Sequence, residues 1–246
     1  SLMDPYCGFF MAQTAENLAK KYDISREAQD EFAFRSHQLG TAAVRSGAFA
    51  EEIVPVTVKQ GRKEFVVDTD DHIKPDTTLE QLASLRAAFG KEGTVTAGNA
   101  SGIVDGGAAV IITTAERAAA EGWTVRAYIR SWGISGVEPE IMGIGPVPSM
   151  QQAAEKAGMT VHDMDFIEIN EAFAAQYLAC EKALELDRDK CNVNGGAVAI
   201  GHPLAATGTR LVLTLFHQLE RAQARYGMAS ACIGGGQGIA MLLERP

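Results

Sequence analysis

Apolar residues in the first hundred positions are spaced first as in helices and then as in strands. Between Ser25 and Ala43 they recur at three- and four-residue steps, and Gly47 follows as a stop signal, so we predict a helix of about five turns. Apolar runs at residues 51–58 and 64–67 flank a polar turn and predict two strands. The capping-box sequence that begins at Thr78 predicts another helix to about Phe89.

The middle of the chain changes character. A glycine-rich passage at residues 97–107 is followed by the apolar run 108–113, which is typical of a buried strand, and by a short helix that ends near Gly122. Glycine-rich stretches favour loops over regular elements. This passage is therefore the expected domain boundary.

Strand-like and helix-like patterns alternate regularly through the rest of the chain. The predicted elements are a strand at 125–131, a helix at 149–157, a strand at 165–169, helices at 171–186 and from the His202 loop to about Arg225, and strands at 228–233 and 239–243. This alternation favours an α/β fold with a mainly parallel sheet covered by helices, and the glycine-rich turn between the last two strands allows them to form a hairpin. Ligand sites in such sheets form at the carboxyl ends of strands, and Asn170 and Gly234 fall just past two of those ends.

Composition and charge narrow the class of protein. The 246 residues are 46% hydrophobic, which is enough for a sizeable core. The net charge of −9 argues against a nucleic-acid or anionic-membrane partner, although a local basic patch could still bind an anionic cofactor. No apolar run approaches the roughly 20 residues that span a bilayer, so we expect no membrane segment. The four cysteines lack CxxC spacing, so we expect no disulfide, no metal site and a cytoplasmic protein.

Three glycine-rich turns between residues 191 and 238 carry a histidine and a cysteine. His202 lies between Gly201 and Pro203, whereas Cys232 ends an apolar strand and is followed by three glycines. Glycine lets backbone N–H groups approach a ligand, and a thiol beside such donors can move a proton next to a developing oxyanion. The combination indicates acyl chemistry.

Each of these residues also has an ordinary structural interpretation. His202 could be a surface-loop histidine, and Cys232 could be a small thiol that fills the core. Asn170, which opens the sequence Asn-Glu-Ala-Phe-Ala after a predicted strand, could cap a helix. Its amide could instead hold a water molecule or a substrate carbonyl, because it offers two donors and an acceptor.

Taken together, these segments resemble a known family. Residues 170–174, 192–196 with Gly201-His202-Pro203, and 232–238 are similar in order and spacing to the three C-terminal signatures of thiolases, the group of acetyl-CoA acetyltransferases and 3-ketoacyl-CoA thiolases. Further likeness at residues 14–17, 25–27, 52–55 and 94–101 extends the resemblance over essentially the whole chain. It implies reversible Claisen chemistry, in which two acetyl-CoA condense to acetoacetyl-CoA or CoA cleaves a 3-ketoacyl-CoA.

The resemblance also implies roles for four residues. The histidine that matches His202 helps to activate a nucleophilic cysteine and forms one oxyanion hole with a water held by the asparagine that matches Asn170. The cysteine that matches Cys232 is the acid/base, which takes or returns the α-proton of the second acetyl group. The backbone N–H that matches Gly234 contributes to a second oxyanion hole.

Further positions are implied for the substrate, which is coenzyme A or an acyl-CoA, with no covalently bound cofactor. Those that match the pantetheine channel are Ser101, Met11, Ala172 and Phe173, of which Met11 and Phe173 could also be simple core residues. Lys74 stands where a basic residue faces the CoA nucleotide. Phe10 stands where some biosynthetic thiolases have a histidine in the substrate pocket, so a preference for acetoacetyl-CoA does not follow from the resemblance.

The domain organisation implied by the resemblance is incomplete. Residues 1–103 resemble most of the CoA-binding loop domain, which is mixed α+β, and residues 104–124 resemble the last strand and helix of the N-terminal half. Residues 125–246 resemble a complete βαβαβαββ C-terminal half, for which the resemblance implies a mixed sheet covered by helices. Thiolases carry their nucleophilic cysteine in a Cys-Ser-Ser-Gly-like turn of the N-terminal half, and this sequence contains no such motif. Cys7 in the loop region, Cys180 in a predicted helix and Cys191 before a strand do not occupy an equivalent turn.

Three hypotheses follow for function. In the first, the chain is part of a thiolase whose activity requires a separate or omitted N-terminal half, which would also contain any targeting segment. In the second, it is a non-catalytic acyl-CoA-binding module, and in the third it is a truncated product without a function of its own. Because unpaired strand edges and apolar faces invite association, we expect either the missing half or further copies of the chain as partners, or aggregation.

Overall fold

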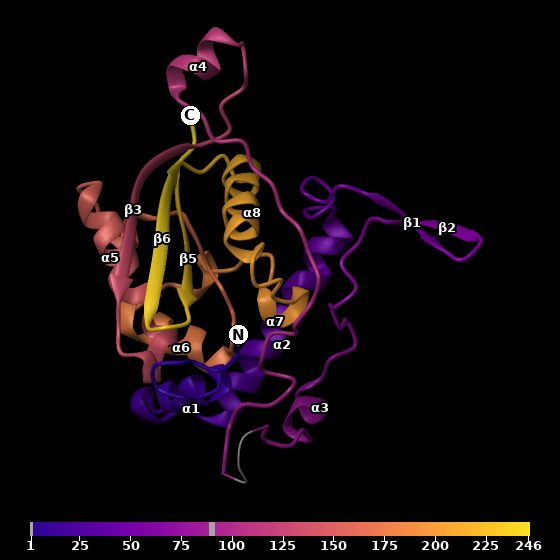
Figure 1. Ribbon diagram of the computed structural model, residues 1–246, viewed down its shortest axis with the longest axis vertical. Helices are drawn as coiled ribbons and strands as arrows, with labels where there is room; N and C mark the ends of the chain where they lie inside the picture. The colour runs from indigo at the N-terminus through magenta and orange to yellow at the C-terminus, as the bar shows by residue number, and fades with distance from the viewer. Residues whose placement is uncertain (1, 89–91) are drawn as a thin grey trace.

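The computed structural model describes residues 2–88 and 92–246, and a four-stranded sheet lies at its centre (Figure 1). Its strands are β3 (Tyr128–Gly136), β4 (Phe166–Ile169), β5 (Tyr226–Ile233) and β6 (Gln237–Glu244), in the spatial order β3-β6-β5-β4. β4 and β5 are parallel, whereas β6 is antiparallel to both β5 and β3. The predicted α/β class, mixed sheet and terminal hairpin are confirmed. The expectation of a mainly parallel sheet is wrong, because the tight β5–β6 turn reverses the chain and β3 then pairs with the reversed strand.

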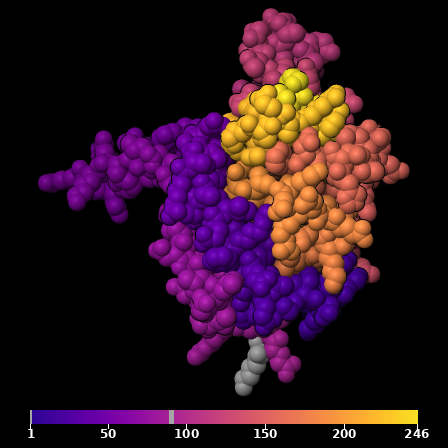
Figure 2. Space-filling model, turned by 180° about the vertical axis from the view of Figure 1, so that it is seen from behind, coloured from indigo at the N-terminus to yellow at the C-terminus, as the bar shows by residue number. Residues whose placement is uncertain are grey.

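Helices and a separate hairpin complete the described structure. The α-helices are α1 (Met11–Tyr22), α2 (Arg26–Ser46), α3 (Leu79–Ala83), α4 (Ala115–Ala120), α5 (Pro146–Lys156), α6 (Ala174–Leu184), α7 (Ala197–Ile200) and α8 (Thr207–Arg221). Short 3₁₀ helices span Pro139–Ile144, Val161–Asp163 and Arg188–Lys190. Strands β1 (Val56–Gln60) and β2 (Lys63–Val67) pair only with each other among the described residues. Figures 1 and 2 show that this hairpin and α4 project from the body of the molecule.

The two faces of the central sheet pack against different helices. Side chains alternate between faces along a strand, and Ile167, Met228 and Leu242 share a buried cluster with residues of α5 and α6. Their sequence neighbours Ala229 and Leu243 belong to a second cluster, which α8 completes with Leu211, Leu215 and Leu219. The sheet is therefore a middle layer between α5 with α6 on one face and α8 on the other.

α8 covers only half of its face of the sheet. It packs against β4 and β5, whereas several apolar side chains of β3 and β6 on the same face, unlike Leu243, stay exposed. Trp132, which pairs with Met241, is 56% exposed, and Ile134, which pairs with Ile239, is 58% exposed. We call Ile129, Trp132, Ile134 and Ile239 the bare half-face.

The other face of β3 packs so closely against α5 that there is no room for a side chain at Gly133. A Cβ on Gly133 would overlap the Ser149 carbonyl oxygen of α5. We expect Gly133→Ala to destabilise the chain by about 1–3 kcal/mol or more, since backbone cannot move aside as a side chain can. Gly136→Ala on the same strand, where a Cβ meets nothing within 4 Å, should change the free energy of unfolding by less than about 0.5 kcal/mol. Urea unfolding of both variants tests this, and equal midpoints would contradict the close packing.

Local sequence signals located some elements correctly. The helix predicted from Ser25 is α2, and the Ser25 hydroxyl accepts a hydrogen bond from the Ala28 N–H at 3.1 Å. The helix predicted from Thr78 does begin there, but it ends at Ala83, and the predicted end at Phe89 lies outside the described residues. Helix α1 was not predicted, because its N-cap is Phe10 rather than a residue with a capping oxygen.

The strand predicted at 108–113 does not form in the described structure. This segment has no regular secondary structure, and Ile111 and Ile112 are 89% and 68% exposed. A strand needs neighbouring strands to satisfy its backbone N–H and C=O groups, and none of the described strands pairs with this segment. None of the described helices is both long enough and apolar enough to cross a lipid bilayer.

Candidate active site

His202 lies in the loop between α7 and α8, beside the carboxyl end of β4. Its Nε2 is 3.2 Å from Nδ2 of Asn170, the residue that follows β4. Its Nδ1 is 2.6 Å from Oγ1 of Thr207, the first residue of α8. Its backbone N–H donates to the Gly102 carbonyl at 2.8 Å. The imidazole is thus held on both ring nitrogens, which does not fit the interpretation of His202 as a free surface-loop histidine.

These contacts determine which ring nitrogen carries the proton. The Thr207 hydroxyl donates to the Pro203 carbonyl at 3.1 Å, so its oxygen is left to accept from His202 Nδ1–H. Nε2 then presents its lone pair to the Asn170 amide. Burial, followed by the positive charge of Arg210, lowers the pKa of His202 to about 4. The ring is neutral at pH 7 and can act as a base through Nε2.

Asn170 does not cap a helix. The segment from Asn170 to Phe173 is not helical, and α6 begins only at Ala174 with Phe173 as its N-cap. The Asn170 side chain is buried, and its Oδ1 has no partner among the described residues. A buried amide oxygen without a partner is costly, so this atom is suited to hold a water or a substrate donor.

Glu171 fixes the segment that carries Asn170. Its buried carboxylate accepts hydrogen bonds from Ser36 Oγ at 2.7 Å, Asn192 Nδ2 at 2.8 Å and the Val198 N–H at 3.2 Å. Burial raises the pKa of Glu171, against the opposing effect of these donors. One side chain therefore joins the end of β4 to α2 and to the loop that leads to His202.

Cys232 lies near the end of β5, two residues after Ser230, whose carbonyl accepts from the Asn170 N–H at 2.9 Å. The thiol is half-buried, and burial raises its pKa to about 12, so it keeps its proton at pH 7. Asn170 and Cys232 consequently lie at the same edge of the sheet, as expected for residues at the ends of two adjacent parallel strands.

The glycine turn after Cys232 is anchored by a residue from the other end of the chain. Gly235 and Gly236 have φ values of +82° and +74°, which side chains rarely tolerate. The Gly235 N–H donates to the buried Asp4 carboxylate at 2.6 Å. Donors from Gly235, Tyr6 and Cys7 lower the pKa of Asp4 although burial opposes them. Asp4 therefore lies beside the turn that joins β5 to β6.

Three of the four predicted pantetheine residues, Ser101, Ala172 and Phe173, lie together. The Ser101 N–H and hydroxyl donate to the Ala172 carbonyl at 3.0 and 2.9 Å, and Ala100 forms a bridge with Phe173. Ser101 directly precedes Gly102, which contacts His202. Ser101, Ala172 and Phe173 are therefore within a few residues of the His202–Asn170 contact.

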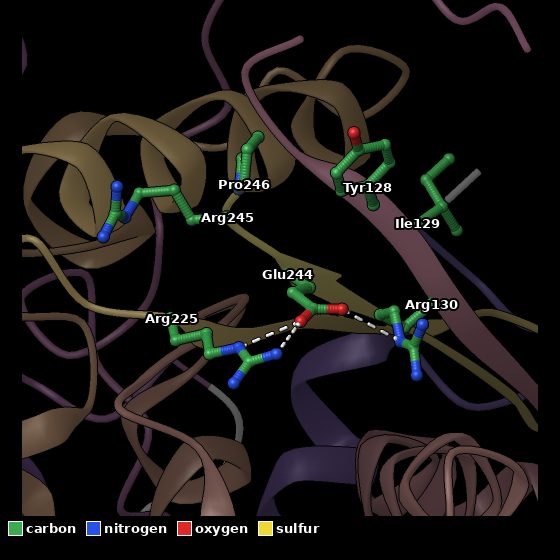
Figure 3. Close-up of a pocket in the computed structure, with 7 residues that line it drawn as sticks. All are labelled: Tyr128, Ile129, Arg130, Arg225, Glu244, Arg245 and Pro246. Carbon is green, nitrogen blue, oxygen red and sulfur yellow. Dashed lines mark hydrogen bonds and ion pairs between the residues drawn. The ribbon is translucent and has the colours of Figure 1, made fainter. Parts of the chain in front are cut away.

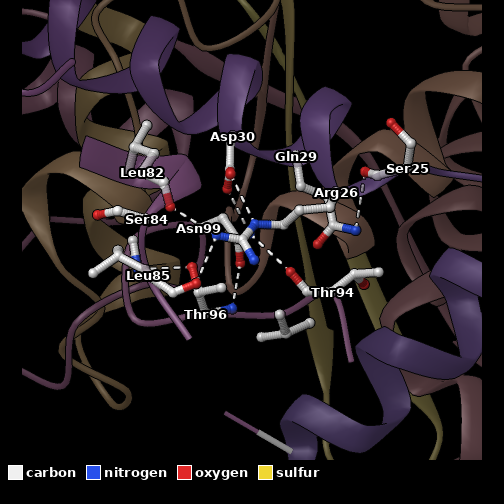
Figure 4. Close-up of polar contacts among 12 residues, drawn as sticks. Ser25, Arg26, Gln29, Asp30, Leu82, Ser84, Leu85, Thr94, Thr96 and Asn99 are labelled. Atoms are coloured by element: carbon white, nitrogen blue, oxygen red, sulfur yellow. Dashed lines mark hydrogen bonds and ion pairs between the residues drawn. The ribbon is translucent and has the colours of Figure 1, made fainter. Parts of the chain in front are cut away.

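A polar network holds the Ser101 loop in place (Figure 4). Asn99 Nδ2 donates to Asp30 Oδ1 at 2.9 Å, and Arg26 Nε donates to Asp30 Oδ2 at 2.7 Å. Arg26 Nη2 also donates to the carbonyls of Leu82 and Leu85 at 2.7 and 3.0 Å. The loop is thereby connected to α2 and α3.

The remaining predicted substrate residues are more peripheral. Met11 opens α1, and its sulfur lies 3.9 Å from the position that a Cβ on Gly234 would take. Phe10 immediately precedes Met11 and is 46% exposed. Lys74 is exposed, and its backbone N–H donates to His37 Nδ1 at 3.2 Å. Its neighbour His72 contacts the Ala199 carbonyl at 2.8 Å, which brings the Lys74 segment toward α7.

The other cysteines differ in their surroundings. Cys180 and Cys191 are buried, and burial raises the pKa of each thiol. Cys7 is half-buried and lies in the turn whose N–H groups bind Asp4. The described residues contain no group of three or more His, Cys, Asp or Glu side chains that could hold a metal ion.

A pocket of about 740 Å³ lies at the opposite end of the sheet (Figure 3). Glu244 is central to it and pairs with Arg225 at 2.7 Å and Arg130 at 3.1 Å. β5 separates this pocket from Cys232, and eight residues of strand span roughly 26 Å. The pocket contains none of the predicted site residues.

Sequence reasoning missed three residues that shape the site: Thr207, Glu171 and Asp4. Glu171 lies in the motif at 170–174, and Thr207 follows the glycine-rich segment around His202, so their polar type at these places was an available signal. No local pattern marks Asp4, because its partner Gly235 is 231 positions away.

Comparison with known proteins agrees with this arrangement. Residues 1–116 match the family described as "Thiolase, N-terminal domain", and residues 123–245 match "Thiolase, C-terminal domain". The fold and site define a thiolase-type α/β protein, and the chain belongs to the thiolase family.

Similar proteins share about half of their aligned residues with this chain. It is 51% identical to the acetyl-CoA acetyltransferase of Paracoccus denitrificans over 245 residues, which are 100% of this chain and 63% of that protein. It is 50% identical to the mitochondrial 3-ketoacyl-CoA thiolase of Homo sapiens over 244 residues, which are 99% of this chain and 62% of the relative. The chain thus spans about three fifths of the length of these relatives.

Solved structures have the same fold. The Bacillus anthracis acetyl-CoA acetyltransferase superposes with a TM-score of 0.98 at 49% identity, covering 100% of this chain and 62% of that one. Human mitochondrial 3-ketoacyl-CoA thiolase in complex with CoA gives a TM-score of 0.94 at 47% identity, covering 100% of this chain and 61% of that one. The predicted thiolase-like fold is confirmed.

Proposed function

We propose that this chain provides the histidine and the acid/base cysteine of a thiolase-type acyltransferase. The reaction is the reversible cleavage of a 3-ketoacyl-CoA by CoA, or the condensation of two acetyl-CoA. The nucleophilic cysteine belongs to a part of the enzyme that lies outside this sequence. The observation that carries the proposal is the placement of His202 between Asn170 and Thr207, at the same edge of the sheet as Cys232.

The geometry supports a definite order of proton transfers. In the cleavage direction, His202 Nε2 takes the proton of the nucleophilic thiol, whose thiolate attacks the 3-keto carbon. The protonated ring can then donate from Nε2 toward the oxyanion that forms. When the C2–C3 bond breaks, Cys232 gives its proton to C2, which fits a thiol that is protonated at rest.

The second half of the reaction restores both groups. The thiol of an incoming CoA gives its proton to the Cys232 thiolate and attacks the acyl group on the nucleophilic cysteine. That cysteine leaves as a thiolate and recovers its proton from His202. The Gly234 N–H, next to the Gly235 N–H that binds Asp4, is the donor that we propose for an oxyanion beside Cys232.

The residues that we propose for CoA binding lie beside the same site. We place the pantetheine arm along Ser101, Ala172 and Phe173, from the His202 loop to Met11 at the start of α1. Lys74 at the exposed rim is suited to a CoA phosphate. Phe10 beside Met11 adds an apolar wall near the acyl end.

The bare half-face indicates where a further part of the enzyme binds. It is a group of exposed apolar side chains beside α8, the helix that begins at the His202 loop. Water contact at such a surface is unfavourable, so we propose that an N-terminal thiolase half, or a second copy of the chain, covers it.

Complementation tests the function directly. The chain is mixed with a separately expressed N-terminal region of the Paracoccus denitrificans acetyl-CoA acetyltransferase, and thiolysis of acetoacetyl-CoA is followed by absorbance. We expect turnover only from the mixture, because neither part has both cysteines of the reaction. The matched control is the same region with its nucleophilic cysteine replaced by alanine.

Each outcome has a clear meaning. Turnover by the chain alone would show that the nucleophile is not missing. If the mixture binds CoA without turnover, the chain is better described as an acyl-CoA-binding module. Absence of both binding and turnover, with both parts folded, contradicts the proposed function.

A further inference from the structure

A buried arginine on α8, Arg210, lies three residues after Thr207, the residue that contacts Nδ1 of His202, and in the described structure no hydrogen bond joins it to the groups used in the proposed reaction. Arg210 Nη1 is 3.5 Å from Oε2 of Glu168, and both side chains are largely buried, at 15% and 2% exposure. Its Nε and Nη2 are buried and make no hydrogen bond within residues 2–88 and 92–246. A charge placed in this way is costly and needs an explanation.

Arg210 joins the same two elements, α8 and β4, that carry the partners of His202. Arg210 follows Thr207 by three residues on α8, so the two side chains lie on one face of the helix. Glu168 precedes Asn170 by two residues at the end of β4, so the two side chains point to the same side of the strand. Thr207 and Asn170 hold the two ring nitrogens of His202, and Arg210 and Glu168 join the same helix and strand one layer below.

We infer that Arg210 is a positioning residue for His202: its contact with Glu168 ties α8, which begins with Thr207, to β4, which leads to Asn170, and these two residues hold the imidazole. The positive charge of Arg210 adds to burial in lowering the pKa of His202. The inference rests on the proposed function for its catalytic meaning. The geometry itself is independent of that function. A neutral ring with Nδ1–H directed at Thr207 is the form that accepts a proton at Nε2.

The acids around Arg210 do not cancel its charge where His202 titrates. They come from other elements: Glu168 from β4, Glu171 from the segment that follows β4, Glu52 from the segment after α2, and Asp70 from the segment after β2. Burial raises the pKa of Glu168 to about 8 and that of Glu52 to about 7, and it also raises the pKa of Asp70, although Arg210 opposes each shift. Near pH 4–5 Glu168 and Glu52 are protonated, so neither offsets the Arg210 charge in the range where His202 titrates.

Other histidines of the chain provide internal controls. The pKa of His37 is also lowered to about 4, by burial and then by His72 and Lys74, without Arg210. The pKa of His217 is lowered by burial and then by Arg126, with Arg221 contributing. Arg221 lies on α8 with Arg210 but does not act on His202. The two arginines of one helix thus influence different histidines.

The test is an NMR titration of the histidine rings in the chain as it stands. Arg210→Met should raise the pKa of His202 by about one unit or more and leave the pKa values of His37 and His217 unchanged. Arg221→Met should raise the pKa of His217 and leave the pKa of His202 unchanged. His202→Gln assigns the resonance, and Arg210→Gln, which can still hydrogen-bond Glu168, serves if the methionine variant does not fold. Arg210→Lys keeps the charge and should keep the pKa of His202 low.

The results decide the inference either way. An unchanged pKa of His202 in a folded Arg210→Met or Arg210→Gln variant overturns it. An equal rise at all three histidines also overturns it, since that outcome means general loosening of the fold. The titration needs no partner half and no turnover, so failure of the complementation assay would leave its result intact, and the reverse holds as well.

Discussion

Replacement of Cys232 by serine is expected to reduce thiolysis by the complemented enzyme by about 10²- to 10⁴-fold, the usual range for a positioned acid or base. The hydroxyl has nearly the same size, so packing at the end of β5 is preserved. It holds its proton far more tightly than a thiol does, even one whose pKa burial has raised to about 12. Protonation of C2 after bond cleavage therefore becomes slow. Steady-state kcat and KM for acetoacetyl-CoA measure the effect, which should appear in kcat.

Cys180→Ser is the matched control for that variant. It makes the same change of sulfur to oxygen in α6, where the hydroxyl can keep the hydrogen bond that Cys180 donates to the Gly143 carbonyl at 3.3 Å. Its kcat should stay within a few-fold of the parent enzyme. A near-normal kcat for Cys232→Ser would refute the acid/base role. A large loss in both variants would instead indicate damage to the shared core.

Local chemistry explains which elements were predictable. Ser25 supplies a capping oxygen, and the glycines after Cys232 supply the positive φ values of a tight hairpin, so α2 and the β5–β6 hairpin were correctly predicted. β3 was placed at 125–131, but it spans Tyr128–Gly136. Its later half contains Gly133 and Gly136, which weaken the strand signal, and Gly133 is there because α5 packs against its backbone.

The segment at Asn170 shows how tertiary contacts override a local pattern. Residues 171–186 have helical spacing, and Asn170 is a good cap by type. The chain nevertheless stays non-helical through Phe173, because Ala100 forms a bridge with Phe173 and Ser101 binds the Ala172 carbonyl. These partners are about seventy positions away, so no window of sequence contains them.

The same limit applies to the candidate site as a whole. His202, Cys232, Asn170 and Gly234 could be proposed from motifs because glycine-rich turns mark them locally. The contacts that tune His202 could not. Three of the acids around Arg210 lie at positions 52, 70 and 168, and each is unremarkable in its own segment. Only the packing of α8 against β4 brings them to one place.

Stability of the chain is expected to fall as pH rises from 5 to 9. The pKa of Glu168 is 4.5 in the reference state and about 8 in the fold, chiefly through burial. Between these values the folded chain holds a proton that the unfolded chain has lost, so the free energy of unfolding decreases with pH. A shift of 3.5 units, from 4.5 to 8, corresponds to up to about 5 kcal/mol. Glu52, raised to about 7, adds an effect of the same sign.

Urea unfolding of the parent chain and of Glu168→Gln at pH 5, 7 and 9 measures this dependence. The amide has the shape of the protonated acid, so the variant should match the parent at pH 5 and exceed it at pH 9. Glu220→Gln is the control of opposite sign, because the hydrogen bond from Arg126 lowers the pKa of Glu220 and its loss should cost stability at neutral and higher pH. A parent chain that grows more stable from pH 5 to 9, or a Glu168→Gln variant with an unchanged slope, would contradict a buried, protonated Glu168 behind the site.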